Sequence, residues 1–135
     1  MTPNFTYAEL TRTDHRTLDN TPDEAALKNL QKLAVFLEEV RALVGRPIII
    51  NSAYRSPAVN ASVGGAAASQ HLRGQAADFR VVGMTPDQIM RVLHKSKLAY
   101  DQLIREYDRW VHISIADKPR KMALIIDRKG VRPFV

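Results

Sequence analysis

The chain has 135 residues, of which 45% are hydrophobic and 25% are charged, and this composition excludes a disordered or fibrous protein. It has no cysteine, so disulfides, thiolate nucleophiles and cysteine-ligated zinc sites are excluded as well. Lysine and arginine exceed aspartate and glutamate by six, which favours anionic surroundings such as nucleic acid, anionic lipid or the polymers of a bacterial envelope. The basic residues are scattered and no nucleic-acid motif accompanies them, so we expect no nucleic-acid partner.

No apolar run approaches the roughly 18 residues that a membrane span needs, and we expect no transmembrane segment. The first residues, Met1–Phe5, have neither a basic start nor an apolar stretch, so no signal peptide is visible. No repeat or linker divides the sequence. We therefore expect a single domain over residues 1–135, present as a monomer.

Two amphipathic helices are predicted. Residues 21–24 read Thr-Pro-Asp-Glu, which predicts a helix capped by Thr21 with the proline at the first helical position. Apolar residues then recur every three or four positions until Gly45 ends the helix. The same capping pattern at residues 85–88 predicts a second helix that runs to about Lys95.

Five short β-branched segments bounded by turn residues are predicted as strands. They are Pro47–Ser52, Ala76–Val82, Gln102–Glu106, Trp110–Ile115 and Met122–Asp127. Because the last three strands follow one another without helices between them, the order predicts an α+β fold. We expect a mainly antiparallel sheet with two principal helices.

The segment between the first two strands, residues 52–76, is rich in glycine and alanine and contains little that could form a core. Connections of this length inside a compact domain are usually functional, so the chemistry is expected here.

A candidate metal site follows from three polar residues. His71 ends that segment, Asp78 lies in an apolar strand, and His112 lies on the polar face of another strand. Two histidines and an aspartate offer the donors that zinc accepts, and they leave a fourth position open for water. The spacing alone also allows satisfied core residues. His15 and His94 lie in polar surroundings and are not expected to take part.

Several spaced motifs resemble the M15 family of zinc peptidases, which includes D-Ala-D-Ala carboxypeptidases and phage L-alanyl-D-glutamate endopeptidases. The family signature S-x-H-x-x-G-x-A-x-D is matched at Ser69, His71, Gly74, Ala76 and Asp78, and the later Trp110-Val111-His112 matches its distant histidine. The resemblance runs from the first helix to the Trp110 strand. It implies a hedgehog/D-Ala-D-Ala peptidase-like fold.

The resemblance implies that His71, Asp78 and His112 bind a zinc ion. It also places Arg55 against the substrate carbonyl, where a guanidinium binds substrate or stabilises an oxyanion. A salt bridge that holds the loop is the alternative role for Arg55.

Three further residues are expected to bind substrate. Ser69 and Gln70 are candidates for hydrogen bonds to the peptide backbone, although Ser69 could equally cap the turn. Trp110 shares the strand face of His112 and is expected to line the site.

The general base is assigned to Glu106. Many family members carry an acid three residues before the last zinc histidine, where this chain has Arg109. The branch that it most resembles places the glutamate six residues before, which selects Glu106. A three-residue connection would pair Glu106 with Trp110 and turn it to the face of His112, whereas a two-residue turn would point it away. Asp108 stays open as the alternative base.

Together these features predict a zinc metallopeptidase that hydrolyses peptidoglycan stem peptides next to a D-amino acid, as a phage-type endolysin or a cell-wall carboxypeptidase. The alternative is a catalytically weak or inactive zinc-binding module, hedgehog-like or a phage virion component. We expect stem peptides and anionic envelope polymers as partners. The expected location is the host cytoplasm until release, then the periplasm or the cell wall. The choice between carboxypeptidase and endopeptidase stays open.

Overall fold

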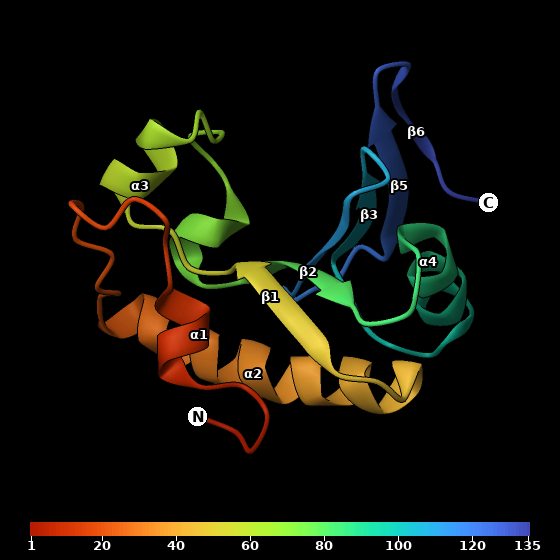
Figure 1. Cartoon of the computed structure of the whole chain (residues 1–135), viewed down its shortest axis with the longest axis horizontal. Helices are drawn as coiled ribbons and strands as arrows, with labels where there is room; N and C mark the ends of the chain where they lie inside the picture. Colours follow the sequence, from red (N-terminus) through yellow and green to blue (C-terminus); the bar gives the residue numbers. More distant parts are fainter.

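A six-stranded sheet in the order β1-β2-β4-β3-β5-β6 organises the computed structural model, which describes residues 1–135 (Figure 1). The strands are β1 (Ile48–Ser52), β2 (Ala76–Val81), β3 (Gln102–Glu106), β4 (Trp110–Ser114), β5 (Met122–Asp127) and β6 (Gly130–Pro133). All neighbouring pairs are antiparallel except β3 and β5, which are parallel. The predicted α+β fold with a mainly antiparallel sheet is confirmed.

The helices are α1 (Tyr7–Thr11), α2 (Glu24–Val44), α3 (Pro57–Ser62) and α4 (Pro86–Lys95), with a 3₁₀ turn η1 (Gln70–Arg73). The two principal helices, α2 and α4, contact each other, and α4 also contacts β3 and β4. Figure 1 shows α2 below β1 and β2 and α3 above them. None of the helices has the length and apolar character that a membrane span requires.

The predicted start of α2 is wrong by two residues. Asp23, not Thr21, is the cap, because its carboxylate accepts a hydrogen bond from the Ala26 N–H at 2.8 Å. Thr21 instead donates its hydroxyl hydrogen to Asp19 at 2.7 Å. The capping box predicted at residues 85–88 is confirmed, since Thr85 and Gln88 exchange the two expected hydrogen bonds.

The short elements of the fold were not predicted from the sequence. Helices α1 and α3 are too brief to show a helical period, and β6 ends in a proline and is largely exposed. The segment at residues 52–76, predicted as a loop, contains α3 and η1. These two turns fold this connection onto the sheet.

Alternation along β2 and β4 gives the sheet two different faces. Ala77, Phe79, Val111 and Ile113 point into the core, where they join α2 and α4 in one cluster of buried apolar residues. The opposite face of the same strands carries Asp78 and His112. The face that points away from this apolar core is therefore the one that bears the candidate metal ligands.

Candidate metal centre

Three buried polar side chains, His71, Asp78 and His112, meet on the face of the sheet that points away from the apolar core. One ligand atom from each lies within 4.8 Å of the others. Their exposed fractions are only 3%, 7% and 9%. Burying polar groups this deeply costs free energy unless they bind one another or an ion. The cluster therefore indicates a binding site.

Strand register brings two of these side chains together. Asp78 on β2 lies directly opposite His112 on β4, so their side chains leave the sheet on the same face. His71 comes from η1, which Ser69 caps by accepting the His71 N–H at 3.2 Å. Gly74 ends η1 with φ at +73°, and a Cβ there would lie 2.6 Å from the Ala26 carbonyl oxygen of α2. Glycine at this position lets η1 pack closely on α2, which places His71 over the sheet.

The hydrogen bonds of the two histidines indicate a place for a cation. His71 Nδ1 donates to the Ala53 carbonyl oxygen at 2.6 Å, which leaves Nε2 as the nitrogen facing Asp78. That Nε2 lies 3.3 Å from Asp78 Oδ1, and His112 Nδ1 lies 2.8 Å from the same oxygen. A neutral His71 would set its lone pair against the carboxylate. A cation among the three groups removes this repulsion, and a set of two imidazoles and a carboxylate is one that zinc accepts.

The charge of Asp78 is stabilised inside the protein. Burial opposes its ionisation most strongly, but the close approach of His112 and then of His71 outweighs burial and lowers the pKa of Asp78. Arg55 adds a contact of 3.4 Å from Nη2 to Asp78 Oδ2. The carboxylate is therefore held in the ionised form that binds a metal.

Arg55 connects the centre to the preceding loop. Besides Asp78, its guanidinium donates to Ser52 at 3.4 Å and to Asn60 at 3.3 Å. A Cβ at Gly65 would collide with the Asn60 side chain and lie 3.0 Å from Arg55, so glycine allows this close approach. The structure thus gives Arg55 the loop-holding contacts of the alternative role, while its side chain stays 17% exposed beside the centre.

Glu106 lies on the same sheet face as His112. The predicted three-residue connection is confirmed, because Glu106 pairs with Trp110 across the β3–β4 hairpin and Ile104 pairs with His112. The Trp110 indole N–H donates to Glu106 Oε2 at 3.0 Å. Burial, and then the negative charge of Asp78, raise the pKa of Glu106 above its ordinary value. From the sequence, Trp110 was predicted to bind substrate. In the structure its indole N–H is bound to Glu106.

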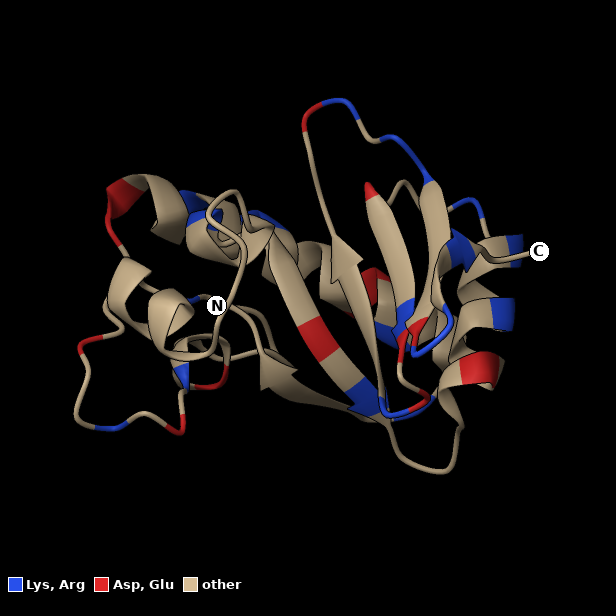
Figure 2. Cartoon of the chain, turned by 90° about the horizontal axis from the view of Figure 1, so that it is seen from above, with Lys and Arg blue, Asp and Glu red and all other residues tan.

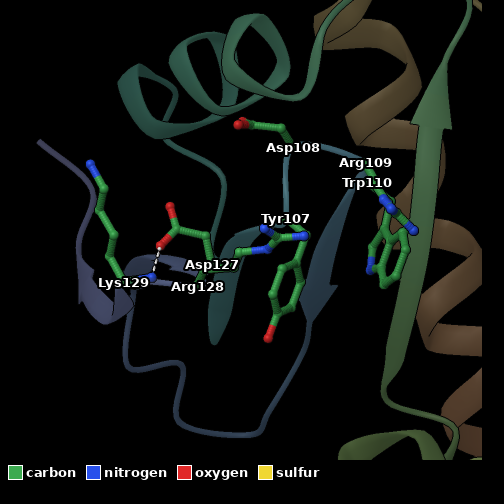
Figure 3. A pocket seen from close by; sticks show the side chains of 7 residues that line it. All are labelled: Tyr107, Asp108, Arg109, Trp110, Asp127, Arg128 and Lys129. Carbon is green, nitrogen blue, oxygen red and sulfur yellow. Dashed lines mark hydrogen bonds between the residues drawn. The ribbon is translucent and has the colours of Figure 1, made fainter.

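The alternative base, Asp108, lies away from the centre. It occupies the hairpin turn with φ at +52°, its side chain is 73% exposed, and it binds Arg105 at 3.1 Å. Arg109 and Tyr107 line a cavity of about 540 Å³ between the β3–β4 and β5–β6 turns, which Trp110 also borders (Figure 3). The position three residues before His112 thus belongs to the hairpin cavity.

A polar network beside the centre was not predicted from the sequence. Asp101 is 2% exposed and binds Arg120 through the backbone N–H and the guanidinium, with distances from 2.7 to 3.0 Å. Gln70 donates its amide hydrogens to Asp101 at 3.0 Å and to the Ile115 carbonyl at 3.3 Å. The signal that could have found it is an aspartate just before the strand that begins at Gln102, in an otherwise apolar stretch.

The other two histidines lie outside the centre, as expected. His15 contacts Ser62 at the surface, and His94 packs edge-on against Phe134.

Two comparisons with known proteins bear on this site. The sequence model of the family described as peptidase M15 matches residues 3–114, which include all three clustered side chains and Glu106. The zinc D-Ala-D-Ala carboxypeptidase of Streptomyces albus G is 36% identical over 78 residues, which are 56% of this chain and 31% of that protein. The chain thus aligns with about a third of the length of this curated relative.

Proposed function

The chain belongs to the peptidase M15 family, and from this premise we propose that it is a zinc-dependent peptidase acting on peptidoglycan stem peptides next to a D-amino acid. The observation that carries the proposal is the buried His71–Asp78–His112 cluster with Glu106 on the same face of the sheet. Activation of water in a metallopeptidase needs metal ligands and a nearby carboxylate that does not itself bind the metal. This face of the sheet supplies both.

His71, Asp78 and His112 would hold the zinc ion, the three protein ligands of a catalytic rather than a structural site. A bound zinc ion supplies Lewis-acid chemistry, since it makes water more acidic and polarises a carbonyl group. The Ala53 carbonyl fixes the ring orientation of His71, and Arg55 fixes Asp78, so the ligands are positioned before any metal arrives.

Glu106 acts as the proton carrier. Its carboxylate takes a proton from the attacking water while the water oxygen forms a bond to the scissile carbonyl carbon. It then returns that proton to the amine nitrogen as the carbon–nitrogen bond breaks, so the residue ends the cycle as it began. The hydrogen bond from Trp110 orients the carboxylate for both transfers.

Arg55 acts on the charge that develops on the carbonyl oxygen. Its guanidinium is held by Ser52, Asn60 and Asp78 and stays partly exposed at the edge of the centre. A fixed cation at this point stabilises the oxyanion without reorganising during the reaction. Its planar fork makes these contacts together, which a lysine cannot do.

The substrate is proposed on two grounds. The similar Streptomyces protein is named a D-Ala-D-Ala carboxypeptidase, and this chain carries a formal net charge of +6, which suits an anionic cell wall. A cell-wall carboxypeptidase and a phage-type endolysin are the two forms that this activity would take. They differ in the bond cut, not in the chemistry of the centre.

The test is digestion of purified muropeptides by the zinc-loaded protein, followed by mass spectrometry. We expect pairs of products whose masses sum to a muropeptide plus one water, and the masses name the bond. A chelator and the variant Glu106→Gln should each suppress these products. Intact muropeptides with a fully zinc-loaded protein would refute the proposal.

A zinc-binding module without catalysis is the second candidate. The observation that favours it is Arg109 at the position where many related enzymes carry an acid, a residue that lines the hairpin cavity instead. This candidate predicts about one zinc per chain and no cleavage. The same digestion therefore separates the two functions.

A further inference from the structure

A second cavity, of about 570 Å³, opens beside the metal centre and is distinct from the hairpin cavity. Its lining includes His112, Gln70 from η1, and Ser69, which is the residue just before η1. A molecule seated in this cavity would contact His112, one of the three clustered side chains. The cavity therefore adjoins the centre.

The charge of this cavity is predominantly positive. Arg73, Lys118 and Arg120 line it, and Asp101 is its one acidic residue. Asp101 is buried and both of its oxygens are engaged by Arg120 and Gln70. The side chains of Arg73 and Lys118 are exposed and take part in none of the ion pairs of the chain. Two unneutralised cations thus face the cavity.

The buried network beneath the cavity gives it a defined shape. Asp101 accepts from Nε and Nη2 of Arg120, so the guanidinium is fixed and its Nη1 has no acceptor within the chain. Gln70 spends its amide hydrogens on Asp101 and Ile115, which leaves its carbonyl oxygen free to accept a peptide N–H. Hydrogen-bond donors and an acceptor are thus prearranged next to His112.

Part of this wall lies outside the residues that the family shares. The family match ends at Ser114, whereas Lys118 and Arg120 belong to the connection between β4 and β5. Figure 2 shows that connection standing out from the sheet, with basic residues along it. This chain therefore adds its own charges to a centre whose ligands lie in the matched part.

We propose that this cavity is a specificity subsite that binds a carboxylate of the peptide substrate close to the scissile bond. Arg73 and Lys118 supply the charge, Arg120 supplies a fixed donor, and Gln70 accepts a backbone N–H. The assignment rests on the proposed function for the identity of the peptide. In addition, free carboxylates on the peptide govern the affinity of the protein for it.

The test uses two synthetic stem peptides, one with every carboxylate free and one with every carboxylate converted to a carboxamide. Binding is measured by calorimetry on zinc-loaded Glu106→Gln protein, which is expected to leave the peptides intact. Turnover is measured on the protein with Glu106 present. We expect the free peptide to bind more tightly, by roughly three- to tenfold at low salt, since each exposed cation contributes modestly.

The double substitution Arg73→Gln with Lys118→Gln should abolish that preference by weakening the free peptide only, raising its KM with kcat unchanged. Lys95→Gln with Lys97→Gln is the matched control, because it removes the same charge from exposed sites that do not line this cavity. The control should keep the preference.

Equal binding of the two peptides, or a preference lost equally in the control, would overturn the subsite, since the basic residues would then attract anions only generally. Cleavage with no carboxylate preference refutes the subsite and leaves the proposed function standing. A preference that depends on Arg73 and Lys118 without any cleavage supports the subsite and refutes the proposed hydrolysis.

Discussion

The metal centre and the C-terminal part of the chain differ in the burial of their ionisable side chains, which are buried at the centre and mostly exposed in the C-terminal part. At the centre, His71, Asp78 and His112 are buried, His112 is hydrogen-bonded to Asp78, and His71 is hydrogen-bonded to the Ala53 carbonyl. In residues 115–135, here called the tail, β5 is only half-buried along its whole length and β6 is mostly exposed. The tail carries six basic residues and two acidic ones, and six of these eight lie between strands.

This difference teaches where function can be lost and where it can be adjusted. A buried polar cluster depends on every member, because removing one leaves the others unpaired at low dielectric. Exposed charges are screened by water and salt and act nearly independently. Changes at the centre should therefore abolish activity, while changes in the tail should modify substrate preference or do little.

The largest effect is expected at the proposed zinc ligands. His71→Ala or His112→Ala should lose bound zinc and all measurable turnover, since two ligands seldom retain zinc. Metal analysis after dialysis and muropeptide digestion measure the two losses. His15→Ala is the matched control, because this histidine lies at the surface and should leave zinc at about one per chain. Full zinc retention in both ligand variants would remove the centre as described.

The next effect is expected at Glu106. Glu106→Gln should bind zinc normally and reduce turnover by roughly 10²–10⁴-fold, the usual contribution of a positioned acid–base group. Asp108→Asn serves as the control, because its carboxylate is exposed and bound to Arg105. If Asp108→Asn proved the more damaging of the two, the base would lie in the hairpin turn.

A smaller effect is expected at Trp110, which we infer to be a positioning residue. Trp110→Phe keeps an aromatic ring and removes the N–H that Glu106 accepts, so turnover should fall by roughly tenfold. The discriminating measurement is the double variant with Glu106→Gln. If Trp110 acts through Glu106, the pair should lose no more than Glu106→Gln alone. Additive losses would give Trp110 a separate role.

A pH effect is expected where the two regions meet, at the ion pair of Asp101 with Arg120. Hydrogen bonds from Arg120, opposed by burial, lower the pKa of Asp101 to about 2. Its ionised form therefore stabilises the fold above its unfolded pKa of about 4, and this contribution is lost as the pH falls through about 2. The Tm difference between the unmodified protein and Asp101→Asn should narrow over that range. A difference that stays constant with pH would contradict the assignment.

The smallest effect is expected at an ion pair confined to the tail. Asp127 binds Arg132 with two contacts of 2.8 Å, and both side chains are partly exposed. Arg132→Gln should leave zinc content and Tm at neutral pH without measurable change, because exposed pairs gain little over water. A loss of stability as large as that of Asp101→Asn would show that the tail is not the loosely held region described above.

Periodicity and capping determined the larger elements from the sequence alone. Helix α4 and the strands β3 and β5 begin and end where the pattern predicts, because a capping box and runs of β-branched residues are local signals. The start of α2 was not determined in this way. Three residues near this start, Asp19, Thr21 and Asp23, are of types that cap helices. Only the folded chain shows that Thr21 donates its hydroxyl hydrogen to Asp19, so that Asp23 is the cap.

The signature that spans His71 and Asp78, with the distant His112, could be found in the sequence because metal ligands are rare residue types at fixed spacing. From the sequence, Glu106 was expected on the face of His112 only if the β3–β4 connection had three residues. The strand register shows that it does. Spacing along one chain specifies which residues can bind a metal, but it does not specify their neighbours from other elements.

Those neighbours were decided by the tertiary structure alone. Asp101 and Arg120 are 19 positions apart, and Gln70 lies 31 positions from Asp101, so no local pattern connects them. Asp101 and Arg120 meet because β3 pairs with β5, with Gln102 opposite Met122, and Gln70 reaches them because η1 packs against β2. Side-chain networks form between whichever elements the packing brings together, which is why the sequence could indicate the three clustered side chains but not the cavity beside them.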